Sequence, residues 1–171
     1  MQRVLNWIDS LTEKTGQAVS WLSTALVLVV CYDVFSRYLL NSSRVAVQEM
    51  EWHLFAALFL LAMAYGLKHN RHVRVDVFYN RLAPRTQMLI NFWGTVLFLI
   101  PFSLVIIWAS GKFVWASFSI RETSPDPGGL PARYVLKAVI PLSFTLLLLQ
   151  GIAIAGQMAS RLWGKSGENV P

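Results

Sequence analysis

Four long stretches of the chain are apolar and nearly free of charge. The uncharged runs follow Lys14, Glu51, Arg85 and Lys137. A helix rises about 1.5 Å per residue, so about 20 residues cross the hydrocarbon core of a bilayer. We therefore predict four transmembrane helices, over about residues 16–40, 50–67, 86–110 and 138–160. This pattern indicates an all-α integral membrane protein whose residues 1–171 form a single domain.

Two prolines fall within these predicted helices. Pro101 lies in the middle of the third span, where a proline removes one backbone hydrogen bond and frees the carbonyl of Leu97. A kink is expected there. It is tolerated because neighbouring helices or water can satisfy the freed carbonyl. Pro141 is expected in the first turn of the fourth span, a position that proline fits well.

The residues before the first span have their own helical pattern. Apolar side chains recur there on one side of a predicted helix, and polar side chains lie on the other. The apolar residues are Val4, Leu5, Trp7, Ile8 and Leu11, and the polar ones are Arg3, Asn6, Asp9, Ser10 and Glu13. This pattern predicts a short amphipathic helix that lies in the membrane interface; a frayed extension is the alternative.

Composition agrees with a membrane protein. Hydrophobic residues make up 55% of the chain and charged residues 14%, and the mean hydropathy is +0.48. So little polar surface excludes a water-soluble globule, and the high apolar content excludes intrinsic disorder. Cys31 is the single cysteine, so a disulfide scaffold is excluded too.

The positive charges predict how the spans are oriented. Of the 15 Lys and Arg residues, nine share the side of both termini and the middle loop, and six lie on the other side. The nine are Arg3, Lys14, Lys68, Arg71, Arg74, Arg81, Arg85, Arg161 and Lys165. Basic residues concentrate on the cytoplasmic side, so both termini are expected in the cytoplasm. The middle loop, residues 68–85, is basic and aromatic. It either binds anionic lipid or a partner protein, or it only sets the orientation of the spans. Nucleic acid is a less favoured partner because spans tether the loop to the membrane on both sides.

Charged residues at the ends of the spans are the candidates for function. Asp33 and Arg37 are four residues apart and can pair on one helix face, either as a local pair or as a contact to another subunit. Glu49 and Glu51 point in different directions on a helix, so they are expected to start the second span and not to form a catalytic carboxylate pair.

The histidines do not suggest a cofactor site. His53 is the only histidine within a predicted span, and we expect it to be a boundary residue that is hydrogen-bonded to a neighbour. A membrane haem needs facing axial ligands. No cysteine or carboxylate cluster lies near His69 and His72, so no metal site is predicted. We also expect no enzymatic activity, because the sequence contains no catalytic motif.

Three stretches resemble one known family. They are DVFSRYLLN at 33–41 followed by the two glutamates, AYGLKHNRHVRVDVFYNRL at 64–82, and YVLKAVIPLSF at 134–144. Together with the four-span plan, they resemble the small membrane subunit of tripartite ATP-independent periplasmic (TRAP) transporters. The H-x-R-x-D pattern in the second stretch is the most specific part of the resemblance.

The resemblance implies a function without catalysis. A small scaffold subunit would sit in the bacterial inner membrane beside a large membrane subunit that holds the solute and sodium sites. A periplasmic solute-binding protein would deliver the solute, mostly an organic acid, and this chain would carry no cofactor of its own. The outer loop at residues 121–134 either touches that protein or merely connects two spans.

These expectations give one hypothesis about residues and two alternatives about function. The residues expected to contact a subunit or lipid are Asp33, Arg37, Glu49, Glu51, Arg71, Arg74 and Asp76. The first alternative is the membrane anchor of a respiratory complex that holds haem or quinone. The second is a small channel made by oligomerisation, although the polar residues of the third and fourth spans are scattered and form no stripe.

Overall fold

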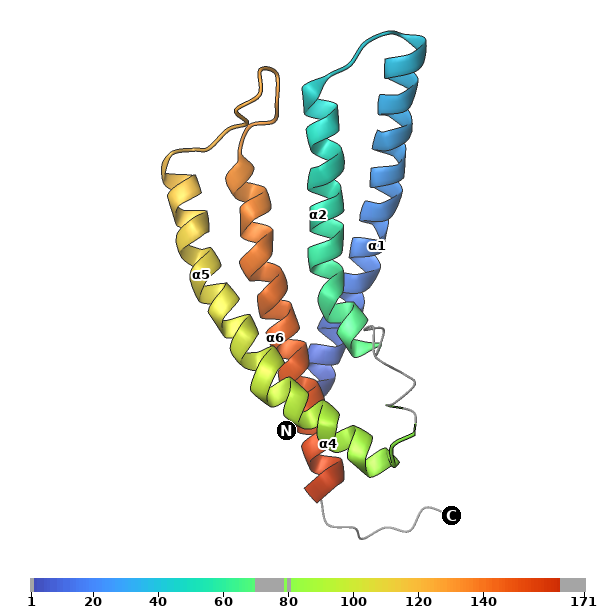
Figure 1. The fold of residues 1–171 in the computed structure, drawn as a ribbon, viewed down its shortest axis with the longest axis vertical. Helices are drawn as coiled ribbons and strands as arrows, with labels where there is room; N and C mark the ends of the chain where they lie inside the picture. Colours follow the sequence, from blue (N-terminus) through green and yellow to red (C-terminus); the bar gives the residue numbers. More distant parts are fainter. Residues whose placement is uncertain (1, 70–78, 80, 164–171) are drawn as a thin grey trace.

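The computed structural model describes residues 2–69, 79 and 81–163, and the regular elements among them are helices. They are α1 (Gln2–Leu39), α2 (Val45–Lys68), α4 (Pro84–Gly94), the π-helical segment η1 (Thr95–Leu99), α5 (Ile100–Ser119) and α6 (Arg133–Trp163). Because α4, η1 and α5 follow one another without a break, the described residues contain four helical stretches long and apolar enough to cross a membrane. The all-α architecture and the four predicted spans are confirmed (Figure 1).

The helices are longer than the sequence pattern suggested. The stretch from Pro84 to Ser119 has 36 residues and α6 has 31. At about 1.5 Å per residue, both exceed a hydrocarbon core of about 30 Å. Helices of this length tilt or extend beyond the apolar layer.

The N-terminal amphipathic segment is not a separate helix. Residues 2–15 continue directly into the first span as one helix of 38 residues. Leu5 and Ile8 are buried against Ala153 of α6, with Leu149 packed beside them. The expectation of a separate interfacial helix was wrong, because the segment is part of α1 and α6 covers its Leu5 and Ile8, although Trp7 stays 61% exposed.

The third span contains the irregularity expected near Pro101. The π-helical segment η1 ends two residues before this proline, and α4 and α5 run in different directions on its two sides (Figure 1). A π segment accommodates an irregular hydrogen-bond pattern without ending a helix, and such segments are frequent at functional sites. The bend therefore has an identifiable cause.

The fourth span begins earlier than predicted. Its helix starts at Arg133, whose backbone N–H donates to the Glu122 carbonyl at 3.0 Å. Pro141 consequently lies inside α6 and not in its first turn, which corrects the expectation. A proline at this position leaves the carbonyl of Lys137 without its helical N–H partner. The Thr145 hydroxyl donates to the Pro141 carbonyl at 2.7 Å.

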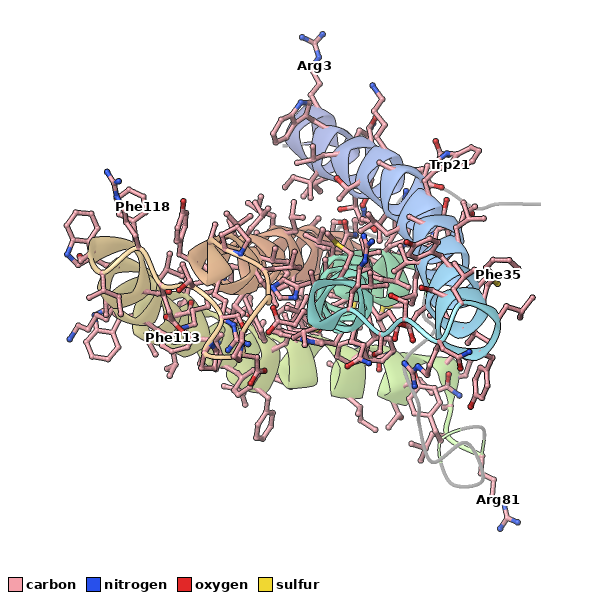
Figure 2. All side chains as sticks on the ribbon, turned by 90° about the horizontal axis from the view of Figure 1, so that it is seen from above. Arg3, Trp21, Phe35, Arg81, Phe113 and Phe118 are labelled. Carbon is pink, nitrogen blue, oxygen red and sulfur yellow. The ribbon has the colours of Figure 1, made fainter. Side chains whose placement is uncertain are left out.

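The helices form an open layer instead of a closed four-helix bundle. Helix α5 packs on α6, α6 packs on α2, and α2 packs on α1. Seen from above, α5, α6 and α2 stand in a row while α1 crosses at an angle (Figure 2). In addition, α1 and α4 both contact α6. Helix α6 is therefore the shared centre of the fold.

Small polar residues hold α5 close to α6. Ser103, Ser110 and Ser117 recur every seven residues on α5, and all three are buried. Ser143 of α6 is buried as well. Small side chains let membrane helices approach closely, so van der Waals packing can stabilise the pair where lipid supplies no hydrophobic drive.

Most of the apolar surface remains uncovered. In the most apolar window of each helix, 33% of the residues of α6 are buried, but only 6% of those of α2. Trp21 and Phe35 project outward from α1, with Trp21 74% exposed (Figure 2). Such a surface is far too apolar for water and needs lipid or another protein against it.

Candidate functional site

Buried and half-buried polar side chains gather at the two ends of the layer. We call the group at the end of the α5–α6 loop the loop cluster, made of Glu49, Ser124, Leu130 and Arg133. We call the group at the opposite end the end cluster, made of Asp9, Thr12, Gln150 and Gln157. Both join segments that are distant in sequence.

Glu49 is the centre of the loop cluster. Its side chain is 5% exposed, and its Oε1 accepts hydrogen bonds from Ser124 Oγ at 2.5 Å and Arg133 Nη2 at 2.7 Å. Its Oε2 accepts from the Leu130 backbone N–H at 2.5 Å. Hydrogen bonds to a charged group are stronger than neutral ones. Glu49 of α2 therefore holds the loop between α5 and α6 in place through these hydrogen bonds.

The loop itself has a defined backbone. The Ser124 N–H donates to the Leu130 carbonyl at 3.1 Å, and the Gly129 N–H donates to the Asp126 carbonyl at 3.0 Å. A Cβ on Gly129 would lie 2.4 Å from Ser124 Oγ and 2.8 Å from Glu49 Oε2. Glycine is needed here because the loop approaches Glu49 so closely.

A second carboxylate secures the base of the same loop. Glu122 Oε2 accepts hydrogen bonds from Lys137 Nζ and from Ser117 Oγ, the latter at 2.6 Å. The hydrogen bond from Lys137, followed by that from Ser117, holds the pKa of Glu122 below its ordinary value. Glu122 thus connects the end of α5 to the first turns of α6.

Glu51 takes no part in the loop cluster. It lies two residues after Glu49 on α2, on a different side of the helix, and no salt bridge of the described residues includes it. The expectation that the two glutamates point in different directions is confirmed. Helix α2 begins at Val45, before both of them.

Asp33 and Arg37 form the local pair that their spacing predicted. Arg37 Nη2 donates to Asp33 Oδ2 within α1, and Asp33 is 3% exposed while the Arg37 side chain is 45% exposed. Pairing reduces the cost of placing a carboxylate beside apolar surface. The partly exposed guanidinium leaves room for a further contact.

The end cluster joins α1 to α6. Gln150 is 1% exposed; its Nε2 donates to Asp9 Oδ1 at 2.9 Å and its Oε1 accepts from Thr12 Oγ1 at 2.7 Å. Gln157 Nε2 donates to Asp9 Oδ2 at 2.8 Å. Both oxygens of the carboxylate therefore have partners, as a buried polar network requires.

The neighbouring side chains tie α1 to α2. Lys68 Nζ donates to Glu13 Oε2 at 2.6 Å and to the Asp9 carbonyl at 2.9 Å. His69 Nε2 lies 3.1 Å from the same Glu13 oxygen. The three longest described helices, α1, α2 and α6, are therefore bound together at one end by polar contacts.

Of the remaining candidate residues, one lies within the described part of the chain and three lie outside it. His53 Nδ1 lies 2.6 Å from the Glu49 carbonyl of its own helix, which confirms the expected hydrogen-bonded boundary residue. Arg71, Arg74 and Asp76 of the basic middle loop lie outside the described residues.

Sequence reasoning missed the end cluster and the partners of Glu49. Gln150 and Gln157 are seven residues apart in an otherwise uncharged span, and this spacing places both amides on one face. That signal was available. By contrast, Glu49 and Arg133 are 84 residues apart, and no local pattern reveals such a pair.

The family model for the DctQ component of tripartite ATP-independent periplasmic transporters matches residues 26–161. This match covers α2 to α5 entirely, most of α6 and the C-terminal part of α1 from residue 26 onward. The chain belongs to this family. The resemblance seen in the sequence is confirmed, and the family is a permease component of transporters. Four apolar helices and the family make it a multi-pass protein of the bacterial inner membrane.

Curated relatives agree with the family. The chain is 28% identical over 159 residues to the isethionate TRAP transporter permease protein DctMQ of Oleidesulfovibrio alaskensis, covering 88% of this chain and 24% of that protein. It is 23% identical over 177 residues to the C4-dicarboxylate TRAP transporter small permease protein DctQ of Vibrio cholerae, covering 91% and 74%. The chain thus spans about a quarter of the first relative and about three quarters of the second.

Proposed function

We propose that this chain is the scaffold subunit of a sodium-coupled TRAP transporter for an organic acid. In this proposal a large membrane subunit holds the solute and sodium, and a periplasmic solute-binding protein delivers the solute. The names of the two relatives, which refer to isethionate and to C4-dicarboxylates, support an organic anion as substrate.

One observation carries the scaffold role: the buried carboxylates and amides of the loop cluster and the end cluster are engaged in contacts between segments of this chain, while the apolar faces stay open. Glu49, Asp9 and Gln150 all have partners from other segments of this chain. Meanwhile only 6–33% of the most apolar helix windows is buried. A solute path needs polar groups that face a cavity, whereas a scaffold needs broad apolar faces for a partner and lipid.

The proposal also assigns a side to each end of the layer. The first turns of α1 and the last turns of α6 lie at the same end, and the α5–α6 loop lies at the other (Figure 1). We place the former in the cytoplasm, following the excess of Lys and Arg on that side. The loop cluster then faces the periplasm, where it would meet the solute-binding protein.

Reconstitution tests the scaffold role. The large subunit should co-purify with this chain, and proteoliposomes should take up an organic acid with a sodium gradient only when both subunits and the solute-binding protein are present. Uptake by this chain alone would support a channel and contradict the proposal. A Soret band in the purified chain would instead support a respiratory anchor.

The two neighbouring glutamates provide a matched pair for testing the loop cluster. Glu49→Gln should speed hydrogen exchange at the Leu130 amide at least tenfold and slow uptake, because that amide loses a charged acceptor. Glu51→Gln removes the same charge two residues away and should leave exchange at the Leu130 amide unchanged. Equal effects of both variants would show that charge alone matters, not the anchored loop.

Accessibility tests the orientation. In a Cys31→Ser background, a cysteine replacing exposed Asp126 should react with a membrane-impermeant maleimide in intact spheroplasts. A cysteine replacing exposed Arg85 should react only after the membrane is opened. The reverse pattern would overturn the assignment of sides.

The charged contact residues remain part of the proposal. The residues proposed to contact the large subunit or lipid are Asp33, Arg37, Glu49, Glu51, Arg71, Arg74 and Asp76. Replacing each charge should weaken assembly or uptake and leave solute capture by the solute-binding protein unchanged. Full assembly and uptake by every variant would contradict this role.

A further inference from the structure

The last turns of α6 lie beside α4, near the end of the layer that carries the end cluster (Figure 1). A hollow lies between these two helices. Its volume is about 250 Å³, enough for roughly eight water molecules. Polar side chains of Gln87, Asn91, Gln157 and Arg161 contribute to its lining. We call this hollow the mouth.

A second, mostly apolar hollow continues from the mouth along the helices. Its volume is about 280 Å³, and Asn91, Ile154 and Met158 line both spaces. Leu67 of α2 and Leu99 of η1 line the deeper part. We call this second space the groove. Mouth and groove together present a polar end near the edge of the spans and an apolar end towards their middle.

The charge in the mouth is positive. Arg161 is exposed, and no salt bridge among the described residues uses it. Among the described residues, the carboxylate of Asp9 contacts the lining through Gln157, and hydrogen bonds from Gln157 and Gln150 engage its two oxygens. An anion placed in the mouth therefore meets a free guanidinium, which suits phosphate geometry well.

The groove has space that the protein does not fill. Gly94 lies in its wall, and a Cβ added there would meet no atom within 4 Å. By contrast, a Cβ on nearby Gly151 would lie 2.5 Å from Leu99 Cδ2. The wall is thus tightly packed on the side of α6 and open beside Gly94.

We propose that the mouth and groove bind one anionic phospholipid, with its phosphate at Arg161 and an acyl chain along the groove past Gly94. The order of polar and apolar lining matches the order of headgroup and chain in a lipid. Basic pockets between membrane helices bind anionic headgroups in the same way. This site is independent of the proposed transport role, because it requires only the described residues of this chain.

Native mass spectrometry of the full chain in a neutral detergent tests the site. Phosphatidylglycerol should bind as a single retained molecule, and phosphatidylcholine of the same chain length should bind at least fivefold more weakly. Arg161→Gln should weaken phosphatidylglycerol binding about fivefold, the effect of one basic residue at a membrane surface. Arg121→Gln, at the opposite end of the layer, is the matched control and should leave binding unchanged.

A second pair of variants tests the groove. Gly94→Leu places a side chain in the open space and should reduce retention of phosphatidylglycerol at least fivefold. Gly66→Leu, at another helical glycine with no atom within 4 Å of its added Cβ, should not. Helical content and elution volume of both variants should match the parent chain, since leucine favours a helix more than glycine does.

Three results would overturn the proposal. Equal retention of the two lipids would remove the role of charge, and unchanged binding in both Arg161→Gln and Gly94→Leu would place the lipid elsewhere. Displacement of the lipid by glycerol phosphate at the same concentration would show that a soluble phosphate binds and that the groove contributes nothing.

Discussion

Replacing Gln150 tests whether the end cluster stabilises the fold. Gln150→Leu keeps a side chain of similar size in a site that is 1% exposed, but it removes the bonds to Asp9 at 2.9 Å and to Thr12 at 2.7 Å. One bond involves a carboxylate and the other is between neutral groups. The variant therefore isolates the polar contribution from the packing.

The size of the effect can be bracketed. A bond to a charged group contributes about 1.5–3 kcal/mol and a neutral bond about 0.5–1.5 kcal/mol, which sets an upper bound near 4.5 kcal/mol. Interhelical hydrogen bonds within membranes average only about 0.6 kcal/mol, with a maximum near 1.7 kcal/mol. Asp9 also keeps its bond from Gln157 at 2.8 Å. We expect Gln150→Leu to lower the free energy of unfolding by about 1–3 kcal/mol.

Reversible unfolding in mixed micelles gives the measurement. A double-mutant cycle with Thr12→Val should show a coupling of at least about 0.5 kcal/mol, because the two side chains share one bond. Gln157→Leu is the matched control: it removes a single bond and should cost less than Gln150→Leu. A Gln150→Leu protein as stable as the parent, or more stable, would refute the reasoning, since leucine packing would then replace everything the amide contributes.

Two further predictions concern the α5–α6 loop. Gly129→Ala should destabilise the loop by about 1–3 kcal/mol, because its Cβ would lie 2.4 Å from Ser124 Oγ; faster hydrogen exchange confined to residues 120–132 would show it, and unchanged exchange would contradict the close approach. The lowered pKa of Glu122 predicts a pH dependence: its stabilising effect is present above its ordinary pKa of 4.5 and is lost as the pH falls through the lower value in the folded protein. The unfolding temperature should fall less steeply between pH 6 and pH 3 in Glu122→Gln than in the parent chain. An identical dependence on pH in both proteins would contradict the bond from Lys137.

The sequence was sufficient for the spans but not for how they meet. Long uncharged runs predict membrane helices because a bilayer demands apolar length and an internally bonded backbone. The same signal does not locate where a helix begins. Charged residues placed residues 133–137 outside the predicted span, but α6 begins at Arg133, whose N–H bonds to a carbonyl of the loop. The amphipathic face near Leu5 was recognised, but its partner was not, since a helix face does not tell whether lipid or protein covers it.

For the candidate site too, contacts within one helix were predictable from the sequence, whereas contacts between distant segments were not. The i,i+4 pair of Asp33 and Arg37 was predictable because both residues lie on one helix. The contacts of Glu49 depend on a loop more than 70 residues later in the chain, so they follow from the assembled layer and not from local pattern. Resemblance to a family supplied the function, while the geometry shows how the chain is held together.

The central place of α6 has a consequence for how the protein is made. Helices α1 and α2 are adjacent in the chain and share the contacts among Glu13, Lys68 and His69, so they can pair as soon as both have left the ribosome. Asp9 and Thr12, however, can form their bonds to Gln150 only after α6 is made, more than 100 residues later in the chain. Until α6 is inserted, a carboxylate and a hydroxyl stay unpaired at the membrane edge. The end cluster can therefore be completed only after the last span has been synthesised.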